Sequence, residues 1–289
     1  MALPAPLALI RPHQWVKNGL VAAPLFFTPD QVGIDSVIAV AIAIVCFCLI
    51  SSSVYILNDY ADREADRQHP EKKDRPLAAG TVSVPTAFVM LAICLVAGFG
   101  GAFVLIGAQV VPYLVVYFVL NLAYSFGLKK MALIDVMIIA LGFIIRVEAG
   151  AAAANLTPSV WIMIMTALGA LFIALAKRRD DLVRTLDAGH RKSLEGYNKQ
   201  FLDSAMSITI GALLVAYMIY TTDRDVMVRM GTTKLYYTAP FVVLGLLRYL
   251  QITLVEERSG SPTKVILTDK FLMGVGALWA LTFAALIYF

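Results

Sequence analysis

Long stretches without charged side chains alternate with short polar segments along the whole chain. Residues 76–128 contain no charged residue, which is enough for two membrane spans of about 20 residues each. Prolines at the ends or within such runs are tolerated in a packed helical bundle. The pattern predicts an all-α integral membrane protein with nine transmembrane helices, at about 14–30, 35–57, 84–106, 110–127, 132–153, 158–177, 203–221, 237–255 and 269–288.

The composition agrees with this pattern. Hydrophobic residues make up 60% of the 289 residues, charged residues only 15%, and the mean hydropathy is +0.77, which excludes an ordinary soluble domain. We therefore expect a single transmembrane domain over residues 1–289, with the lipid bilayer as its surroundings. No nucleic-acid partner is expected, and a homo-oligomer is compatible with the sequence. Residues 1–10 lack a basic residue, so we expect no cleaved signal peptide.

The basic residues predict the orientation. Of the 24 Lys and Arg residues, twenty fall at one set of helix ends, three at the opposite ends (Arg224, Arg229 and Lys234), and Arg146 alone lies inside a span. Cytoplasmic loops of membrane proteins carry the excess of Lys and Arg. We therefore expect a multi-pass protein of the cell membrane with a cytosolic N-terminus, cytosolic polar segments at 58–75 and 177–199, and an external C-terminus.

The first of these segments carries a regular row of oxygen-bearing side chains. Asn58, Asp62 and Asp66 recur at i, i+4 and i+8, and Asp59 lies three residues before Asp62. On a helix this spacing aligns three carboxylates and an amide. Aligned carboxylates repel one another, and a divalent cation would offset that repulsion. Because Mg²⁺ usually binds a few carboxylates together with substrate phosphates, the row predicts a Mg²⁺–phosphate site with these four residues as metal ligands.

An alternative for the row is an acidic helix face that pairs with Arg63 and Arg67. Three cations follow directly, and they suit either phosphate oxygens or anchoring at the cytoplasmic surface. They are Lys72, Lys73 and Arg75.

The second polar segment, 176–200, is basic on balance. Clustered cations suit phosphate oxygens, whereas a solvated loop at anionic lipid heads is the alternative. The candidate phosphate-binding residues are Lys177, Arg178, Arg191 and Lys192. We expect Asp181 to orient a cation or a ribose hydroxyl, and Tyr197 either to hydrogen-bond a phosphate or to serve as an interfacial aromatic residue.

Further polar residues lie at or inside the spans. Lys17 either meets a lipid phosphate or anchors the chain at the interface. Tyr124 and Lys129 close the fourth helix on the cytosolic side. Arg146 lies deep within a span, where charge is costly and usually functional. It either touches a polar group in a cavity or braces the bundle through backbone carbonyls.

Two motifs carry a family resemblance. Asn58-Asp59-x-x-Asp62-x-x-x-Asp66, followed by Arg75-Pro76-Leu77-Ala78-Ala79-Gly80, resembles the first motif of the UbiA superfamily of intramembrane prenyltransferases. The resemblance implies a nine-helix bundle with a cytosolic cap over a central cavity. In that cavity Mg²⁺ on acidic motifs binds a diphosphate. Tyr124 and Lys129 match a site position of that superfamily.

The second acidic motif of that superfamily is not present in its usual DxxxD or DxxD form, because Asp180 and Asp181 are adjacent. The basic segment is similar instead to one branch, the polyprenyl-phosphate phosphoribosyltransferases, of which decaprenyl-phosphate enzymes are the best known. The residues that carry this similarity are Lys177-Arg178-x-x-Asp181-Leu182, Arg191-Lys192-Ser193-Leu194-x-x-Tyr197, Arg11-Pro12-x-Gln14-Trp15-Val16-Lys17-Asn18, and Asp135-Val136 with Gly142-Phe143-x-x-Arg146.

This resemblance implies transfer of 5-phosphoribosyl from phosphoribosyl diphosphate (PRPP) to a polyprenyl phosphate, with release of diphosphate, for arabinofuranose or ribofuranose precursors of the cell envelope. The residues expected to be catalytic are Asp62, Asp66 and Asp181. Those expected to bind substrate are Lys17, Asn58, Lys73, Arg75, Tyr124, Lys129, Arg146, Lys177, Arg178, Arg191, Lys192 and Tyr197. Two alternatives stay open: an aromatic or haem prenyltransferase of the same fold, and a non-enzymatic lipid-binding or transport bundle.

Overall fold

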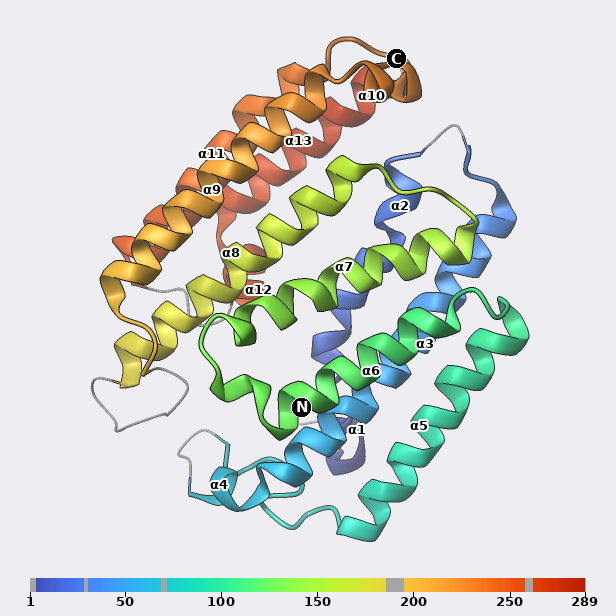
Figure 1. Ribbon diagram of the computed structural model, residues 1–289, viewed down its shortest axis with the longest axis vertical. Helices are drawn as coiled ribbons and strands as arrows, with labels where there is room; N and C mark the ends of the chain where they lie inside the picture. Colours follow the sequence, from blue (N-terminus) through green and yellow to red (C-terminus); the bar gives the residue numbers. More distant parts are fainter. Residues whose placement is uncertain (1–3, 29–30, 69–71, 186–194, 258–261, 289) are drawn as a thin grey trace. The chain divides into compact units, whose positions relative to one another are not determined.

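The structure is a computed structural model that describes residues 4–28, 31–68, 72–185, 195–257 and 262–288. Every regular element within these ranges is a helix (Figure 1). This confirms the predicted all-α class. Contacts between Cα atoms divide the chain into two compact units, residues 1–129 with 142–158 and residues 130–141 with 159–289. Helix α7 (Ile134–Ala154) contributes its first turns to unit 2 and the rest to unit 1.

Seven helices in the described ranges are long and apolar enough to cross a membrane. Each coincides with a predicted span. They are α3 (Ile34–Ala61), α5 (Val84–Leu105), α7, α8 (Val160–Thr185), α9 (Lys199–Thr222), α11 (Ala239–Leu254) together with the 3₁₀ turn η5 (Leu235–Thr238) before it, and α13 (Lys270–Tyr288). The apolar helix α6 (Val111–Phe126) corresponds to the fourth predicted span but has only 16 residues.

The first predicted span, 14–30, is not one long α-helix. It is the 3₁₀ helix η1 (Pro12–Ala22), which follows the short helix α1 (Ala5–Leu9), and then the short helix α2 (Ala23–Phe26). Eleven residues are unusually many for a 3₁₀ helix, so tertiary contacts must favour it. Side chains of η1 supply such contacts, because the indole of Trp15 donates to Ser52 and the amide of Asn18 donates to Ser51, both on α3.

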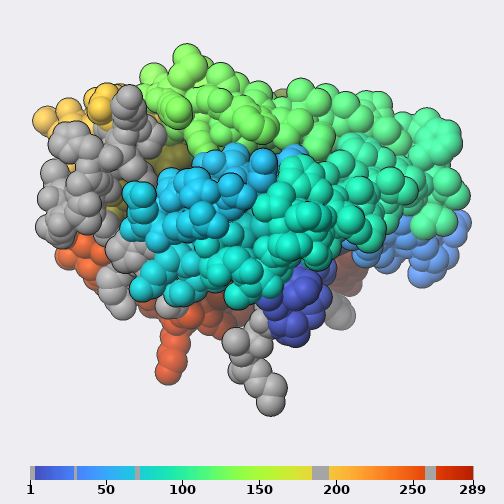
Figure 2. Space-filling view, turned by 90° about the horizontal axis from the view of Figure 1, so that it is seen from below, coloured from blue at the N-terminus to red at the C-terminus, as the bar shows by residue number. Residues whose placement is uncertain are grey.

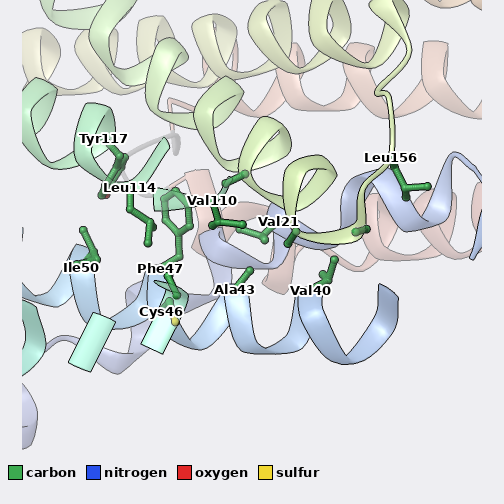
Figure 3. Packing of buried hydrophobic residues seen from close by; sticks show 14 of the residues in the cluster. Val21, Val40, Ala43, Cys46, Phe47, Ile50, Val110, Leu114, Tyr117 and Leu156 are labelled. Atoms are coloured by element: carbon green, nitrogen blue, oxygen red, sulfur yellow. The ribbon is translucent and has the colours of Figure 1, made fainter. Parts of the chain in front are cut away.

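The core of unit 1 lies where η1, α3, α6 and the later turns of α7 meet (Figure 3). Phe47 of α3 packs against Tyr117 of α6 with ring centroids 5.1 Å apart. Gly150 of α7 lies directly against the backbone of Val21 in η1, where a Cβ atom would overlap the carbonyl group. The absence of a side chain at Gly150 therefore permits the close approach of η1 and α7.

Unit 2 is built from the first turns of α7 and the helices after residue 159. Its core includes Phe172 of α8, Leu202 and Met206 of α9, and Tyr249 of α11. Helix α8 packs along α9, and α11 packs along α13. Two short helices, α10 (Arg224–Met230) and α12 (Pro262–Thr268), connect these long ones.

Large apolar side chains cover the outward face of several helices. In unit 1, α5 packs along α3, and its other face exposes Val89, Ile93, Val96 and Val104, each more than half accessible. Figure 2 shows the teal surface of α5 open on this side. Such a face suits contact with lipid, where apolar surface carries no cost. All three cysteines, Cys46, Cys48 and Cys94, are buried in α3 and α5.

Candidate functional site

The predicted row of oxygen ligands lies at the junction of α3 and the short helix α4 (Arg63–Arg67). Asp62 ends α3, yet the backbone pattern continues across it. The amide of Asp62 donates to the carbonyl of Asn58 at 2.9 Å, and the amide of Asp66 donates to Asp62 at 2.8 Å. The i, i+4, i+8 spacing expected for a helix is therefore present despite the break.

Two carboxylates of the row share one guanidinium. Asp59 and Asp66 are buried, with 2% and 3% of their surface exposed. Nη1 of Arg75 donates to Asp66 Oδ2 at 2.7 Å and to Asp59 Oδ1 at 3.1 Å. Arg11 also pairs with Asp59 Oδ1, from a left-handed backbone conformation (φ 52°) that is rare outside glycine. Buried carboxylates are tolerated because these cations pair with them.

The remaining carboxylate takes a different partner. Asp62, about a third exposed, accepts two bonds from the ammonium of Lys129, at 2.7 and 3.0 Å. Lys129 follows α6, so it reaches the row from a different part of unit 1. The row therefore divides into a buried pair, Asp59 with Asp66, and the more exposed Asp62.

These contacts change the electrostatic argument made from the sequence. Repulsion between the carboxylates is offset by Arg11, Arg75 and Lys129, so the row is neutralised by side chains alone. Within the described part of the chain, Arg63 and Arg67 form their ion pairs with Glu64 and not with the row.

The donor set nevertheless fits a hard divalent cation. Asp59 and Asp66 direct oxygens at one shared cationic atom, and their carboxylate oxygens are ligands that Mg²⁺ prefers. Among the described residues no group of three or more His, Cys, Asp or Glu side chains could hold a metal. Two carboxylates are enough when substrate phosphates complete the coordination, which is common for Mg²⁺. The acid that shares the Arg75 guanidinium with Asp66 is Asp59 rather than Asp62.

Arg146 lies inside α7 and is 5% exposed. Its guanidinium donates to Asn18 Oδ1 at 2.8 Å, to the carbonyl of Gly142 at 2.7 Å and to the hydroxyl of Tyr117 at 3.0 Å. It also lies 4.7 Å from the centre of the Tyr117 ring and 5.5 Å from that of Phe47, within cation–π range. Arg146 therefore joins η1, α6 and its own helix α7 through two side-chain groups and one backbone carbonyl.

The second network belongs to unit 2 and centres on Asp135, at the start of α7, which is fully buried. Its carboxylate accepts from Nε of Arg178 at 2.5 Å, from the hydroxyl of Tyr197 at 2.6 Å and from the amide of Val136 at 2.9 Å. Burial and the hydrogen bond to Asp135 raise the pKa of Tyr197 to about 12, so the phenol stays protonated at neutral pH. Nη1 of Arg178 donates to Asp181 at 3.1 Å.

The two adjacent acids of α8 differ in their surroundings. Asp181 pairs with Arg178, whereas Asp180 is buried, with 6% of its surface exposed. Neighbouring residues of a helix point about 100° apart, so these two carboxylates do not form a common metal site. The adjacent pair therefore does not reproduce the DxxxD or DxxD spacing, in which both acids lie on one helix face.

The other predicted residues are spread over both units. In unit 1, Asn58 and Tyr124 are half-buried on α3 and α6, Lys17 is half-buried on η1, and Lys73 is exposed. Lys177 is exposed on α8 in unit 2. Arg191 and Lys192 lie outside the described residues.

Arg11 and Asp135 are not among the site residues that the sequence predicts. Arg11 heads a motif that carried the family resemblance, and Asp135 is an acid at the start of an apolar run. These two features are the sequence signals that could have indicated a role in the site. Their partners, 48 and 43 positions away, could not be read from local spacing.

Comparisons with known proteins show which family the chain resembles. The model of the UbiA prenyltransferase family matches residues 20–275. The chain is 36% identical to the decaprenyl-phosphate phosphoribosyltransferase of Mycolicibacterium smegmatis, over 97% of this chain and 91% of that protein. It is 34% identical to the enzyme of the same name from Corynebacterium glutamicum, over 96% and 85%.

Among solved structures, a UbiA homolog from Archaeoglobus fulgidus bound to GPP and Mg²⁺ superimposes with a TM-score of 0.70. The alignment covers 98% of this chain and 99% of that one at 16% identity, so it supports the fold. The family match and the full-length relatives together lead to one conclusion. This chain is a multi-pass membrane protein that belongs to the UbiA prenyltransferase family.

Proposed function

We propose that the protein transfers a 5-phosphoribosyl group from PRPP to a polyprenyl phosphate. The observation that carries this proposal is the 36% identity, along nearly the whole chain, to a decaprenyl-phosphate phosphoribosyltransferase. An oxygen of the lipid phosphate attacks C1 of the ribose. The bond from C1 to the diphosphate breaks, and diphosphate leaves with the bonding electrons. The product, polyprenyl-phosphoryl-ribose 5-phosphate, suits synthesis of furanose precursors for the cell envelope.

Residues of the acidic row serve the diphosphate of the donor. Asp59 and Asp66, whose carboxylates converge on Arg75, would hold Mg²⁺, with Asn58 and Asp62 close by in the row. When bound, Mg²⁺ neutralises charge on the leaving diphosphate. Arg75 already lies at these carboxylates and has the fork geometry that suits phosphate oxygens.

Lys129 serves the same end of the donor from the other side of the row. Its ammonium is within hydrogen-bond distance of Asp62, where it can also meet a phosphate oxygen. Lys17 and Lys73 are further candidates for phosphate contacts in unit 1, with Tyr124 as a hydroxyl donor.

Polar residues of α8 are candidates for contacts to the sugar and the other anions. Lys177, which is exposed at the end of α8, is a candidate for the donor 5-phosphate or the lipid phosphate. Asp181 accepts a hydrogen bond from a ribose hydroxyl. A phosphate monoester is already an anionic nucleophile, so a strong general base is not required, and positioning and electrostatics supply most of the rate.

We further propose a topology with nine spans, in which η1 with α2 and the short helix α6 complete the set. The excess of basic residues places the N-terminus and the acidic row in the cytoplasm and the C-terminus outside. PRPP is a soluble, highly charged donor, so a cytosolic site suits it. The whole chain then acts as one catalytic domain in the cell membrane.

The test uses purified protein in detergent with Mg²⁺, polyprenyl phosphate and PRPP. The proposal predicts ribosylated lipid and diphosphate in equal amounts, measured by mass spectrometry and a diphosphate assay. If the protein instead couples an allylic diphosphate to an aromatic acceptor, it is an aromatic prenyltransferase. If neither reaction occurs, the non-enzymatic alternative is favoured.

The metal assignment has its own test. Asp66→Ala should abolish turnover and leave the bundle folded, as judged by circular dichroism and size-exclusion chromatography. Glu64→Ala is a matched control, because Glu64 lies in the same short helix, is exposed, and forms its ion pairs with Arg63 and Arg67 rather than with Arg75. Wild-type turnover by Asp66→Ala would contradict the assignment.

A further inference from the structure

Asp135 has no role in the reaction described so far, yet it is among the best-connected acids of unit 2. It is fully buried, and its partners come from three places: the start of α7, the cytosolic end of α8, and Tyr197 just before α9. A buried carboxylate is costly unless it is paired and hydrogen-bonded. Asp135 meets both conditions, so its surroundings are specifically organised around a negative charge.

The backbone around Asp135 is fitted to the same contact. Leu133 has a left-handed conformation (φ 69°), and its amide donates to the Tyr197 hydroxyl at 2.7 Å. A branched residue keeps that conformation only where its surroundings impose it, and such residues cluster at functional sites. Gly196 lies against Ala132, where a Cβ atom would overlap the alanine side chain. Both features bring the segment before α9 close to the start of α7.

Arg178 connects this buried centre to Asp181. Its guanidinium is planar and rigid, so fixing the Nε edge on Asp135 also fixes the direction of Nη1. Nη1 donates to Asp181, whose side chain is 22% exposed, whereas Asp135 is fully buried. The order Asp135, Arg178, Asp181 therefore runs from the interior of unit 2 to its surface.

We infer that Asp135 is a positioning residue for the transfer reaction: through Arg178 it fixes the carboxylate of Asp181 as the acceptor for a ribose hydroxyl of the donor. This inference rests on the proposed function. A carboxylate accepts hydrogen bonds and does not donate them, so Asp181 suits a hydroxyl rather than a phosphate oxygen. Arg178, engaged by two acids, then acts on the sugar indirectly instead of binding phosphate.

A double-mutant cycle tests the coupling. Asp135→Asn removes the charge that holds Arg178, and Asp181→Asn removes the acceptor. Each single variant should lower kcat by about 10- to 100-fold, because a displacement of reacting groups by about 1 Å has an effect of that size. The double variant should be no slower than Asp181→Asn alone, and KM for polyprenyl phosphate should not change. Independent effects that multiply in the double variant would overturn the inference.

Asp203→Asn is the matched control. Asp203 pairs with Arg179, the neighbour of Arg178 on α8, at 2.6 Å, and it has no role in the reaction. This variant should keep the wild-type kcat, and its effect should be independent of Asp181→Asn. A control that lowers kcat as much as Asp135→Asn would show a general response to lost ion pairs and would contradict the inference.

A further double variant separates positioning from folding. Asp135→Asn with Arg178→Gln removes both buried charges and keeps neutral hydrogen-bonding groups, so its thermal midpoint should return toward that of the wild type. Its kcat should stay low, because the neutral pair no longer fixes Asp181. Recovery of both stability and kcat would overturn the inference. A wild-type protein that forms no ribosylated lipid would refute the proposed reaction itself, and with it this inference.

Discussion

Single side chains in unit 1 are paired over long distances in the sequence. Lys129 lies 67 positions from Asp62, and Arg11 lies 48 positions from Asp59. Local spacing predicted which carboxylates are neighbours, because i and i+4 relations follow from helix geometry alone. It could not predict which cations neutralise them, since that choice depends on how separate helices pack.

The first prediction concerns Arg75, which competes with a metal for Asp59 and Asp66. Arg75→Gln should bind Mg²⁺ more tightly without substrate, by about tenfold if one charge interaction of roughly 1.4 kcal/mol is removed. The same variant should bind PRPP more weakly, because a phosphate contact is lost. Calorimetry with Mg²⁺ and then with PRPP measures both effects.

Arg63→Gln provides the control for this prediction. Arg63 pairs with Glu64 at the surface and not with the row, so both affinities should equal those of the wild type. Weaker Mg²⁺ binding by Arg75→Gln would contradict the competition between Arg75 and the metal.

A second prediction concerns Arg146. Arg146→Met leaves Asn18, Tyr117 and the carbonyl of Gly142 without their buried donor. Each unpaired buried group costs about 1–3 kcal/mol, so the midpoint of thermal unfolding in detergent should fall clearly. Arg67 is exposed, so the unfolding midpoint of Arg67→Met should equal that of the wild type within experimental error. Equal midpoints for both variants would show that Arg146 is not a brace.

At the scale of elements, the long helices could be placed from the sequence because charge-free runs of about 20 residues have few other structures open to them in a bilayer. Eight of the predicted spans match helices of the structure. The 3₁₀ winding of η1 could not be predicted, because it depends on the docking of Trp15 and Asn18 against α3. The break between α3 and α4 at Asp62 could not be predicted from the sequence either, since the i, i+4 hydrogen bonds of the backbone continue across it.

The close approach of η1 and α7 leads to a third prediction. Gly150→Ala places a methyl group on the backbone of Val21, so one helix must shift and the protein should unfold at a lower temperature. Gly274→Ala, on α13, meets no atom within 4 Å and should be neutral or stabilising by up to about 1 kcal/mol. Thermal unfolding of both variants in detergent makes the comparison. An unchanged midpoint for Gly150→Ala would argue against the tight contact.

At the scale of the whole molecule, the basic residues predict one orientation in the membrane. A green fluorescent protein fused before residue 1 should fluoresce in cells, because the proposed orientation places that end in the cytosol. Green fluorescent protein fused after residue 289 would be exported through the general secretory route, so it should stay dark. Alkaline phosphatase fused at that position should be active. Fluorescence at both ends would require an even number of spans and would contradict nine.

The burial of Cys46, Cys48 and Cys94 has a practical consequence. These are the only thiols in the chain, so maleimide reagents will find little to modify in the native protein. New cysteines at exposed positions such as Gln68 and Gln200 can therefore carry spin labels in an otherwise unaltered background. Electron paramagnetic resonance on that doubly labelled protein would report, in nanometres, how the spacing between the acidic row and the start of α9 responds to PRPP.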